Sequence, residues 1–277
     1  MSGAWPDPPP GFVLRSGGST ALYVNRALED HVRRRGLDRL EGWEAALLGG
    51  VSGGGRGATA VIGDAQAPRW RLKRMRRGGL LAPAWRDRYP SARRLVATLA
   101  ASVEAAARGV PTALPVALLV RRGPLGLTRG AMAFEEIEGS EALATRIRDG
   151  IAAPEEISAA METVRAMHER GVHHPDLNLG NILVRTGPGA SPAIFVVDLD
   201  RADFRDGALP FTAREAGVRR MERSCAKTTG KPGPFGIGSE DLWYTAYAAA
   251  DRELARRLAT GRRAGRWRLA LHRLGWR

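Results

Sequence analysis

The stretch GVHHPDLNLGNILV (residues 171–184), which VVDLD (196–200) follows, decides the fold of this chain. Asp176 and Asn181 stand on a predicted loop that enters an apolar strand. Phosphoryl transfer needs a carboxylate that accepts the proton of the attacking hydroxyl, and an oxygen ligand for Mg²⁺ on the same rigid loop. Asp176 is therefore the predicted catalytic base, and Asn181 is a predicted metal ligand.

Asp198 ends the second apolar run, IFVVD. A carboxylate at the end of a buried strand costs free energy unless it is paired or binds a metal, so Asp198 is the predicted principal Mg²⁺ ligand. Aspartate and asparagine are also common turn and cap residues, and one such pair would mean little. The histidine before Asp176, the strand after Asn181 and the second strand that ends at Asp198 together favour a phosphoryl-transfer centre.

A glycine-rich stretch, GGVSGGGRG (49–57), precedes the first firm strand pattern. Its backbone N–H groups could approach phosphates closely, and Gly53, Gly55 and Gly57 are the predicted contacts. A flexible linker has the same composition. Lys73 follows in the next strand and is predicted to contact the α- and β-phosphates of ATP, although a plain exposed basic position among neighbouring arginines is the alternative.

The segment FEEIEG (134–139) lies where the strand-rich half of the chain meets the helical half. The backbone of Glu135 and Ile137 is predicted to hydrogen-bond an adenine edge, as a connector between lobes can. A simple linker with solvent-facing acids is the alternative. His168 stands on the helix before the catalytic loop, and we expect it to pack rather than to act as an acid or base.

Periodicity gives an α+β organisation with a small, mainly antiparallel half and a larger helical half. Residues 1–25 are rich in Pro, Gly and Ser and are expected to form a loose leader, followed by units at 26–137 and 138–277. The expected elements are a hairpin of 58–62 and 69–75, a long helix at 91–108, a hairpin of 115–120 and 131–137, a helix at 155–170, and short strands at 181–185 and 193–197.

The balance of 43 Lys+Arg against 29 Asp+Glu gives a net charge of +14, which suggests an anionic partner such as nucleic acid, anionic lipid or a phosphorylated glycan. One cysteine, Cys225, cannot form an internal disulfide. The start of the chain has no secretory pattern, and no apolar run approaches the roughly 18 residues of a membrane span. We therefore expect a soluble cytoplasmic protein.

With GVHHPDLNLGNILV and VVDLDRA, the earlier LKRMRRGGL and the later RRMERSCAK, the chain resembles the lipopolysaccharide kinase family, which includes 3-deoxy-D-manno-octulosonic acid (Kdo) kinase and core heptose kinases. The resemblance covers roughly residues 45–230. It implies a two-lobed protein-kinase-like fold, ATP with Mg²⁺, and a sugar hydroxyl of Kdo-lipid A or the core oligosaccharide as acceptor, at the cytoplasmic face of the inner membrane. Asp176 then matches the catalytic base, Asn181 and Asp198 the metal ligands, and Lys73 the phosphate lysine.

The chain departs from the protein-kinase pattern in places. Leu95 stands where the helix after the lysine strand normally offers a glutamate, so Lys73 is expected to be held differently. Asp200 replaces the glycine of Asp-Phe-Gly, which the sugar kinases share and which disfavours a protein substrate. Pro175 replaces the arginine of His-Arg-Asp, which implies that no activation-loop phosphate is bound there.

The C-terminal stretch 252–277 crowds arginines around leucines and tryptophans. This pattern suits an anionic membrane surface, and an ordinary helix with a solvated basic face is the alternative. The other functions that the residues leave open are a kinase for another small hydroxyl substrate or for protein, and a pseudokinase that binds nucleotide or membrane. Nucleic-acid binding explains the charge but not the site, so no nucleic-acid partner is expected.

Overall fold

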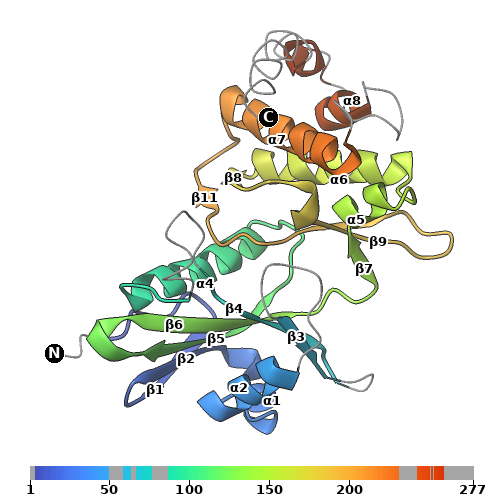
Figure 1. The fold of residues 1–277 in the computed structure, drawn as a ribbon. Coiled ribbons are helices and arrows are strands. Elements are labelled where there is room, and N and C mark those ends of the chain that lie inside the picture. Colours follow the sequence, from blue (N-terminus) through green and yellow to red (C-terminus); the bar gives the residue numbers. More distant parts are fainter. Residues whose placement is uncertain are drawn as a thin grey trace, which may run out of the picture. The chain divides into compact units, whose positions relative to one another are not determined.

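The computed structural model describes residues 4–49, 59–63, 67–76, 87–230, 242–249, 251 and 253–258. The chain divides into two compact units (Figure 1). The first comprises Met1–Ala107 and Thr112–Glu138, and the second comprises Arg108–Pro111 and Gly139–Arg277. The division after Glu138 lies beside the boundary that the change in composition predicts.

The first unit is built on a six-stranded sheet in the order β1-β2-β5-β6-β4-β3, and every neighbouring pair is antiparallel. The strands are β1 (Phe12–Gly17), β2 (Thr20–Asn25), β3 (Thr59–Ile62), β4 (Trp70–Arg74), β5 (Pro115–Arg122) and β6 (Thr128–Glu135). The two predicted hairpins, β3 with β4 and β5 with β6, are confirmed. A short 3-10 turn, η2 (Pro124–Gly126), joins β5 to β6.

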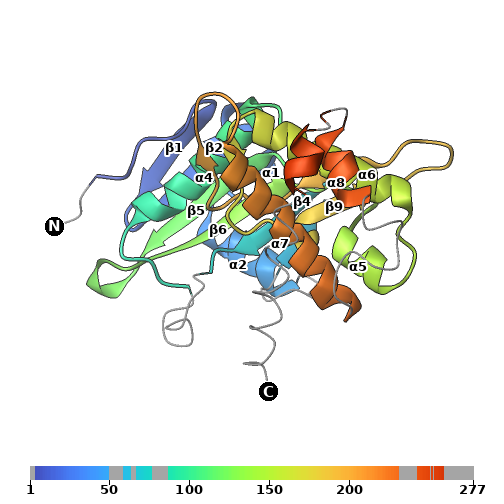
Figure 2. The same ribbon diagram turned by 90° about the horizontal axis from the view of Figure 1, so that it is seen from above.

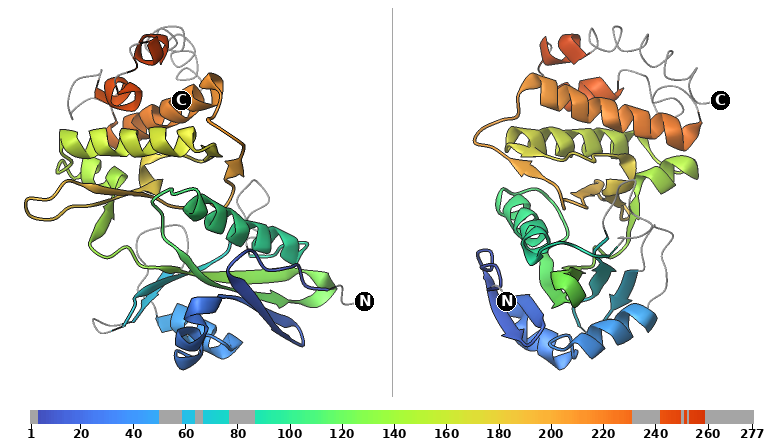
Figure 3. Two further views of the ribbon diagram at one scale, coloured as in Figure 1. Left: turned by 180° about the vertical axis from the view of Figure 1, so that it is seen from behind. Right: turned by 60° about the vertical axis from the view of Figure 1, so that its left-hand side comes forward.

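Helices cover both faces of this sheet (Figure 3). The predicted long helix is α4 (Ala92–Ala107), and its apolar face packs with Leu95 and Leu99 on one side of the sheet. The 3-10 turn η1 (Arg26–Leu28) leads to α1 (Glu29–Arg34) and α2 (Leu40–Gly49), and their buried Val32 and Trp43 pack on the other side. This second helical layer was not among the elements predicted from the sequence.

The expected loose leader at 1–25 is wrong, because this segment supplies two strands of the sheet. β1 and β2 form a tight hairpin in which Gly17 pairs with Thr20, and Gly18 adopts a positive φ of 55° in the turn. The glycines that suggested looseness are therefore turn residues, which hairpins of this kind require. Ahead of β1, Trp5 lies under the Arg122 guanidinium at 3.7 Å and so fastens the preceding segment to the sheet.

The second unit is mainly helical, and Figure 2 shows its helices from above. Its helices are α5 (Leu143–Arg148), α6 (Pro154–Glu169), α7 (Phe211–Thr229) and α8 (Leu242–Ala248), with the 3-10 turn η3 (Leu179–Asn181). Its strands are β7 (Ser140–Ala142), β8 (Val172–His173), β9 (Ile182–Arg185), β10 (Ala193–Val196) and β11 (Asp203–Phe204). The predicted helix before the loop is α6, and the predicted short strands are β9 and β10, which pair antiparallel.

α6 packs against α8 and β10, and α5 packs against α7. Both α5 and α7 also contact η3, so the end of the loop that carries the sequence motif packs against helices of its own unit. Within the part of the chain that the structure describes, no helix combines the length and apolar character needed to cross a membrane. Most of the basic C-terminal stretch and of the glycine-rich stretch lies outside the described residues, as do Gly53, Gly55 and Gly57.

Candidate active site

The loop between β8 and β9 is organised around the backbone carbonyl of Asp176. The side-chain amide of Asn178 donates to this carbonyl at 2.8 Å, and the side-chain amide of Asn181 donates to it at 2.9 Å. Asn178 also accepts from the Gly180 N–H at 2.9 Å and begins η3 as its N-cap. The loop is therefore held by its own asparagines, and the Asp176 side chain projects from it in an exposed position.

The orientation of the Asn181 amide follows from its partner. A carbonyl oxygen can only accept, so the Asn181 atom that faces the Asp176 carbonyl must be the NH₂ group. The oxygen Oδ1 then points away from that bond. A neutral amide oxygen is a ligand that Mg²⁺ accepts in proteins, so the residue has the orientation that a metal ligand needs.

Asp198 is placed beside Asn181 by the backbone. The N–H of Val197 donates to the carbonyl of Asn181 at 2.9 Å and extends the pairing of β9 with β10 beyond the last strand residues. Asp198 follows at once with a positive φ of 65°, a conformation that costs free energy for a residue with a side chain. Its carboxylate is exposed, while the next residue, Leu199, is buried in the core. The structure thus brings Asp176, Asn181 and Asp198 together on one hydrogen-bonded frame.

His174 joins the two halves of this frame. Its Nδ1 accepts from the Asp176 N–H at 3.2 Å, and its Nε2 lies 3.1 Å from the Val197 carbonyl. An imidazole that accepts through Nδ1 and donates through Nε2 is neutral, and burial lowers the pKa of His174, which favours the same form. The sequence motif includes this histidine, but its role in the frame depends on contacts between residues far apart in the sequence.

α7 contacts the loop between β8 and β9, and this helix was not part of the site predicted from the sequence. Ser224 accepts from the Leu179 N–H at 3.1 Å. At Gly217 the helix passes so close to the loop that an added methyl group would lie 2.8 Å from a carbon of the His168 ring and 3.5 Å from the Leu177 side chain. Only a residue without a side chain permits this approach.

His168 is a packing residue, as predicted. It is almost completely buried, and its Nδ1 lies 2.7 Å from the Tyr247 hydroxyl. Burial, with smaller contributions from the charges of Arg214 and the neighbouring histidines, lowers the pKa of His168 to about 3. The residue is therefore neutral at physiological pH and links α6 to α8.

Lys73 lies on β4 in the first unit, on the sheet face that α4 covers. It pairs across the strands with Met132, and its Nζ lies 5.4 Å from the centre of the Phe134 ring. Leu95, which stands at the position of the missing helix glutamate, is fully buried and packs on Gly130 of β6. The helix therefore presents an apolar side chain at that position.

Glu135 ends β6, and Ile137 follows in the segment that leads out of the first unit. The Glu135 N–H donates to the Leu114 carbonyl at 2.8 Å. The intervening Glu136 forms a bidentate ion pair with Arg71 of β4, at 2.6 and 2.7 Å. The Glu136 carboxylate is thus paired with Arg71 rather than simply facing solvent. This ion pair fixes the segment against β4.

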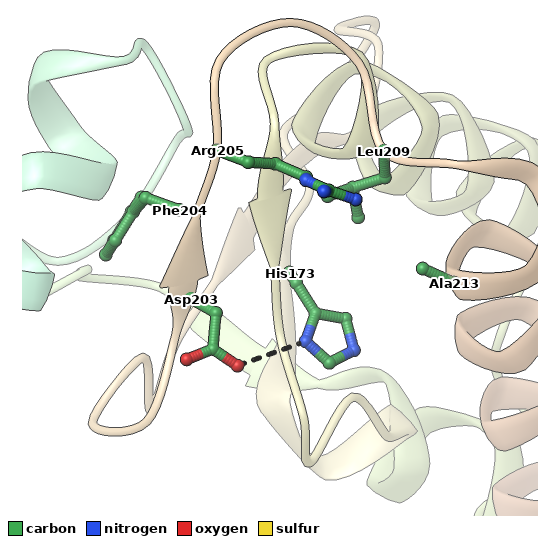
Figure 4. A pocket seen from close by; sticks show the side chains of 6 residues that line it. All are labelled: His173, Asp203, Phe204, Arg205, Leu209 and Ala213. Carbon is green, nitrogen blue, oxygen red and sulfur yellow. Dashed lines mark hydrogen bonds and ion pairs between the residues drawn. The ribbon is translucent and has the colours of Figure 1, made fainter.

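A cavity of about 210 Å³ lies between β8, β11 and the start of α7 (Figure 4). Its lining residues are His173, Asp203, Phe204, Arg205, Leu209 and Ala213. His173 Nδ1 lies 3.4 Å from the Asp203 carboxylate, so this histidine points toward β11 while the adjacent His174 points toward Val197. This cavity could not be predicted from the sequence, because its walls come from separate segments.

Comparison with known families decides the identity of the chain. Residues 48–236 match the model of the lipopolysaccharide kinase (Kdo/WaaP) family. The chain belongs to this family. It is 33% identical over 186 residues to a 3-deoxy-D-manno-octulosonic acid kinase of Xanthomonas oryzae pv. oryzae (strain PXO99A). The aligned residues cover 65% of this chain and 70% of that protein. It is 30% identical over 193 residues to a protein of the same name from Xylella fastidiosa (strain 9a5c), over 68% and 74% of the two chains.

A solved structure described as WaaP in complex with acyl carrier protein has a TM-score of 0.49 and 20% sequence identity, and covers 84% of this chain and 95% of that chain. Membership of the lipopolysaccharide kinase (Kdo/WaaP) family confirms that the chain is a phosphotransferase, and membership of a kinase family implies the use of ATP. A sheet with one long helix followed by a mainly helical unit confirms the predicted α+β fold class.

Proposed function

We propose that the chain transfers the γ-phosphoryl group of ATP to a hydroxyl of the Kdo sugar in the inner core of lipopolysaccharide. The observation that carries the proposal is the frame of Asp176, Asn181 and Asp198, because it presents a carboxylate, an amide oxygen and a second carboxylate from one rigid hydrogen-bonded segment. The Kdo kinases that the chain resembles support the choice of acceptor.

In this proposal Asp176 accepts the proton of the acceptor hydroxyl while that oxygen forms a bond to the γ-phosphorus. The bond from the γ-phosphorus to the bridging oxygen breaks, and ADP leaves. Exposure of the Asp176 side chain supports the role, since the acceptor must reach it from solvent.

Asn181 and Asp198 are the residues that would hold Mg²⁺. Their donor set of one amide oxygen and one carboxylate fits a cation that takes its remaining oxygen ligands from nucleotide and water. Mg²⁺ held by these residues would neutralise charge on the phosphates. Lys73 would contact the α- and β-phosphates, the glycine-rich loop with Gly53, Gly55 and Gly57 would lie over them, and the backbone of Glu135 and Ile137 would bind adenine.

The test is transfer of labelled phosphate from ATP to Kdo-lipid A by the purified protein with Mg²⁺. We expect Asp176→Asn and Asp198→Asn to lose at least about a hundredfold in kcat while the circular dichroism spectrum stays native. Asp206→Asn, a change at an exposed aspartate of the same unit, is the matched control and should keep full activity. Full activity of either site variant would overturn the assignment of the site.

Parallel assays with an aminoglycoside and with a protein acceptor separate the proposed function from its alternatives. Transfer to either of these, and none to Kdo-lipid A, would overturn the choice of acceptor. Binding of ATP without transfer to any acceptor would favour a pseudokinase.

The acceptor is a membrane glycolipid, so we also place the protein at the cytoplasmic face of the inner membrane as a peripheral partner. The basic and apolar sequence of residues 252–277 supports this part of the proposal. Liposomes with anionic lipid should retain the full chain more than a chain that ends at Asp251, and neutral liposomes should retain neither. Equal retention of the two chains on anionic liposomes would remove the membrane contact.

A further inference from the structure

The two flanks of α7 carry opposite charge patterns. Successive residues of a helix turn by about 100°, so residues three, four and seven apart share one side. One flank carries the acids: Glu215 forms an ion pair with Arg219 at 2.9 Å, and Glu222 accepts from the Tyr244 hydroxyl at 2.8 Å. The other flank carries no acid between its start and end, and its residues are Ala213, Ala216, Arg220, Arg223, Ser224 and Lys227.

The basic flank borders the catalytic loop. Ser224 lies on this flank and accepts from the Leu179 N–H, in the same short loop that carries Asp176 and Asn181. Gly217 sets the depth of the contact, because α7 packs there directly on Leu177 and His168. Arg220, one turn before Ser224, and Arg223, its neighbour in sequence, therefore lie on the part of α7 that contacts this loop.

Arg220 and Arg223 form no ion pair with an acidic side chain within the part of the chain that the structure describes. Partial burial lowers the pKa of Arg223, and the charges of Arg220 and Arg219 lower it further, while Glu222 opposes them. Like charges close together destabilise one another unless an anion lies between them. Arg219 has such an anion in Glu215, whereas Arg220 and Arg223 form no ion pair among the residues that the structure describes.

We propose that Arg220 and Arg223 of α7 bind an oxyanion of the acceptor, a sugar carboxylate or a lipid phosphate, and so position its hydroxyl at Asp176. This inference rests on the proposed function. Guanidinium groups suit such ligands because they donate in pairs to carboxylate and phosphate oxygens. The phosphates of ATP are not the ligand in this proposal, so the two arginines should set the affinity for acceptor and leave the affinity for ATP unchanged.

The kinetic test compares Arg220→Gln, Arg223→Gln and the double variant with the wild type, and uses Arg219→Gln as the matched control on the other flank. We expect the double variant to raise the KM for Kdo-lipid A about tenfold or more and to leave the KM for ATP unchanged. A hydrogen bond to a charged group contributes enough binding free energy for a change of this size. Arg219→Gln should stay within about twofold of the wild type. An unchanged KM for Kdo-lipid A in the double variant would overturn the inference.

A binding test keeps this inference separable from the proposed reaction. Isothermal titration of the Asp176→Asn protein with Kdo-lipid A, with and without the Arg220→Gln and Arg223→Gln changes, needs no turnover. Loss of binding with the arginines supports the oxyanion site even if the wild type transfers no phosphate, which would overturn only the proposed function. Binding that is equal with and without them overturns the site.

The same titration with lipid from which the lipid A phosphates have been removed identifies the oxyanion. If the effect of the two arginines persists, they bind the Kdo carboxylate, and if it disappears, they bind a lipid phosphate. Either result supports the site.

Discussion

The imidazole of His174 donates a hydrogen bond to the carbonyl oxygen of Val197 at 3.1 Å. The same ring accepts from the N–H of Asp176, so one neutral side chain spans the distance between the loop with the proposed base and the segment with the proposed metal ligand Asp198. Small displacements of such groups reduce rate strongly, because phosphoryl transfer depends on positioning.

Replacement of His174 should therefore impair catalysis more than folding. We expect His174→Ala to lower kcat by about a hundredfold, from loss of positioning, and to cost about 1–3 kcal/mol of unfolding free energy. His173→Ala is the matched control, because the contact of His173 with Asp203 is partly exposed. This substitution should cost less than about 1 kcal/mol of unfolding free energy. Steady-state kinetics and urea unfolding of both variants measure the difference, and equal kcat in the two would contradict the role of His174.

Acid should destabilise the protein through its buried histidines. Folding lowers the pKa of His168 from 6.5 to about 3 and lowers the pKa of His174 as well. Between pH 6.5 and pH 3, His168 binds a proton in the unfolded chain but not in the folded chain. The unfolding free energy therefore falls as pH falls from 6.5 toward 3.

One such group changes the unfolding free energy by about 1.4 kcal/mol per pH unit. For His168 the loss between pH 6.5 and pH 5 is about 2 kcal/mol. Urea unfolding at pH 7 and pH 5 should show a smaller loss for His168→Gln than for the wild type. The same loss in both proteins would show that His168 does not cause it.

Arg146 neutralises a buried acid. Its guanidinium holds both carboxylate oxygens of Glu156, at 2.7 and 2.8 Å, and Glu156 is only 3% exposed. Arg146→Met would leave this carboxylate buried without a partner and should cost about 3–5 kcal/mol of unfolding free energy.

Glu141→Gln is the control for Arg146. The Glu141 carboxylate lies 3.4 Å from the Arg146 guanidinium, and its side chain is 40% exposed. Its neutralisation should cost less than about 1 kcal/mol of unfolding free energy. Chemical denaturation of the two variants compares these values, and similar losses would contradict the importance of the buried pair.

Gly217 allows α7 to approach the catalytic loop. Gly217→Ala would press a methyl group against the His168 ring, so we expect a loss of about 1–3 kcal/mol and reduced activity, although alanine favours a helix. Gly49→Ala, at the end of α2, adds a methyl group with no heavy atom within 4 Å and should be neutral or slightly stabilising. Thermal unfolding separates the two, and a stabilised Gly217→Ala protein would show that the helix can move away without cost.

Much of the fold follows from local pattern. The long helix α4 and the hairpins β3–β4 and β5–β6 appear where apolar periodicity and turn residues predict them. The hairpin of β1 and β2 was missed, because its glycines and the prolines before it have the composition of a loose segment as well as of a turn. Only the pairing of β2 with β5, far along the chain, distinguishes the two.

The candidate site shows the same division. The spacing of Asp176, Asn181 and Asp198 could be found in the sequence, because each residue type has a chemical role at that spacing. The contacts of His174 with Val197 and of Ser224 with Leu179 could not, since they join segments that the sequence separates.

The sequence alone determined the family, the helices α4 and α6 and the hairpins β3–β4 and β5–β6, and it predicted the phosphoryl-transfer motif, because these depend on residue chemistry and on near neighbours. The tertiary structure alone decided that the Asn181 amide turns its oxygen away from the Asp176 carbonyl, and that Ser224 of α7 contacts the loop that carries Asp176. Hydrogen-bond direction and helix packing depend on which distant groups meet, and a linear pattern holds no record of those meetings.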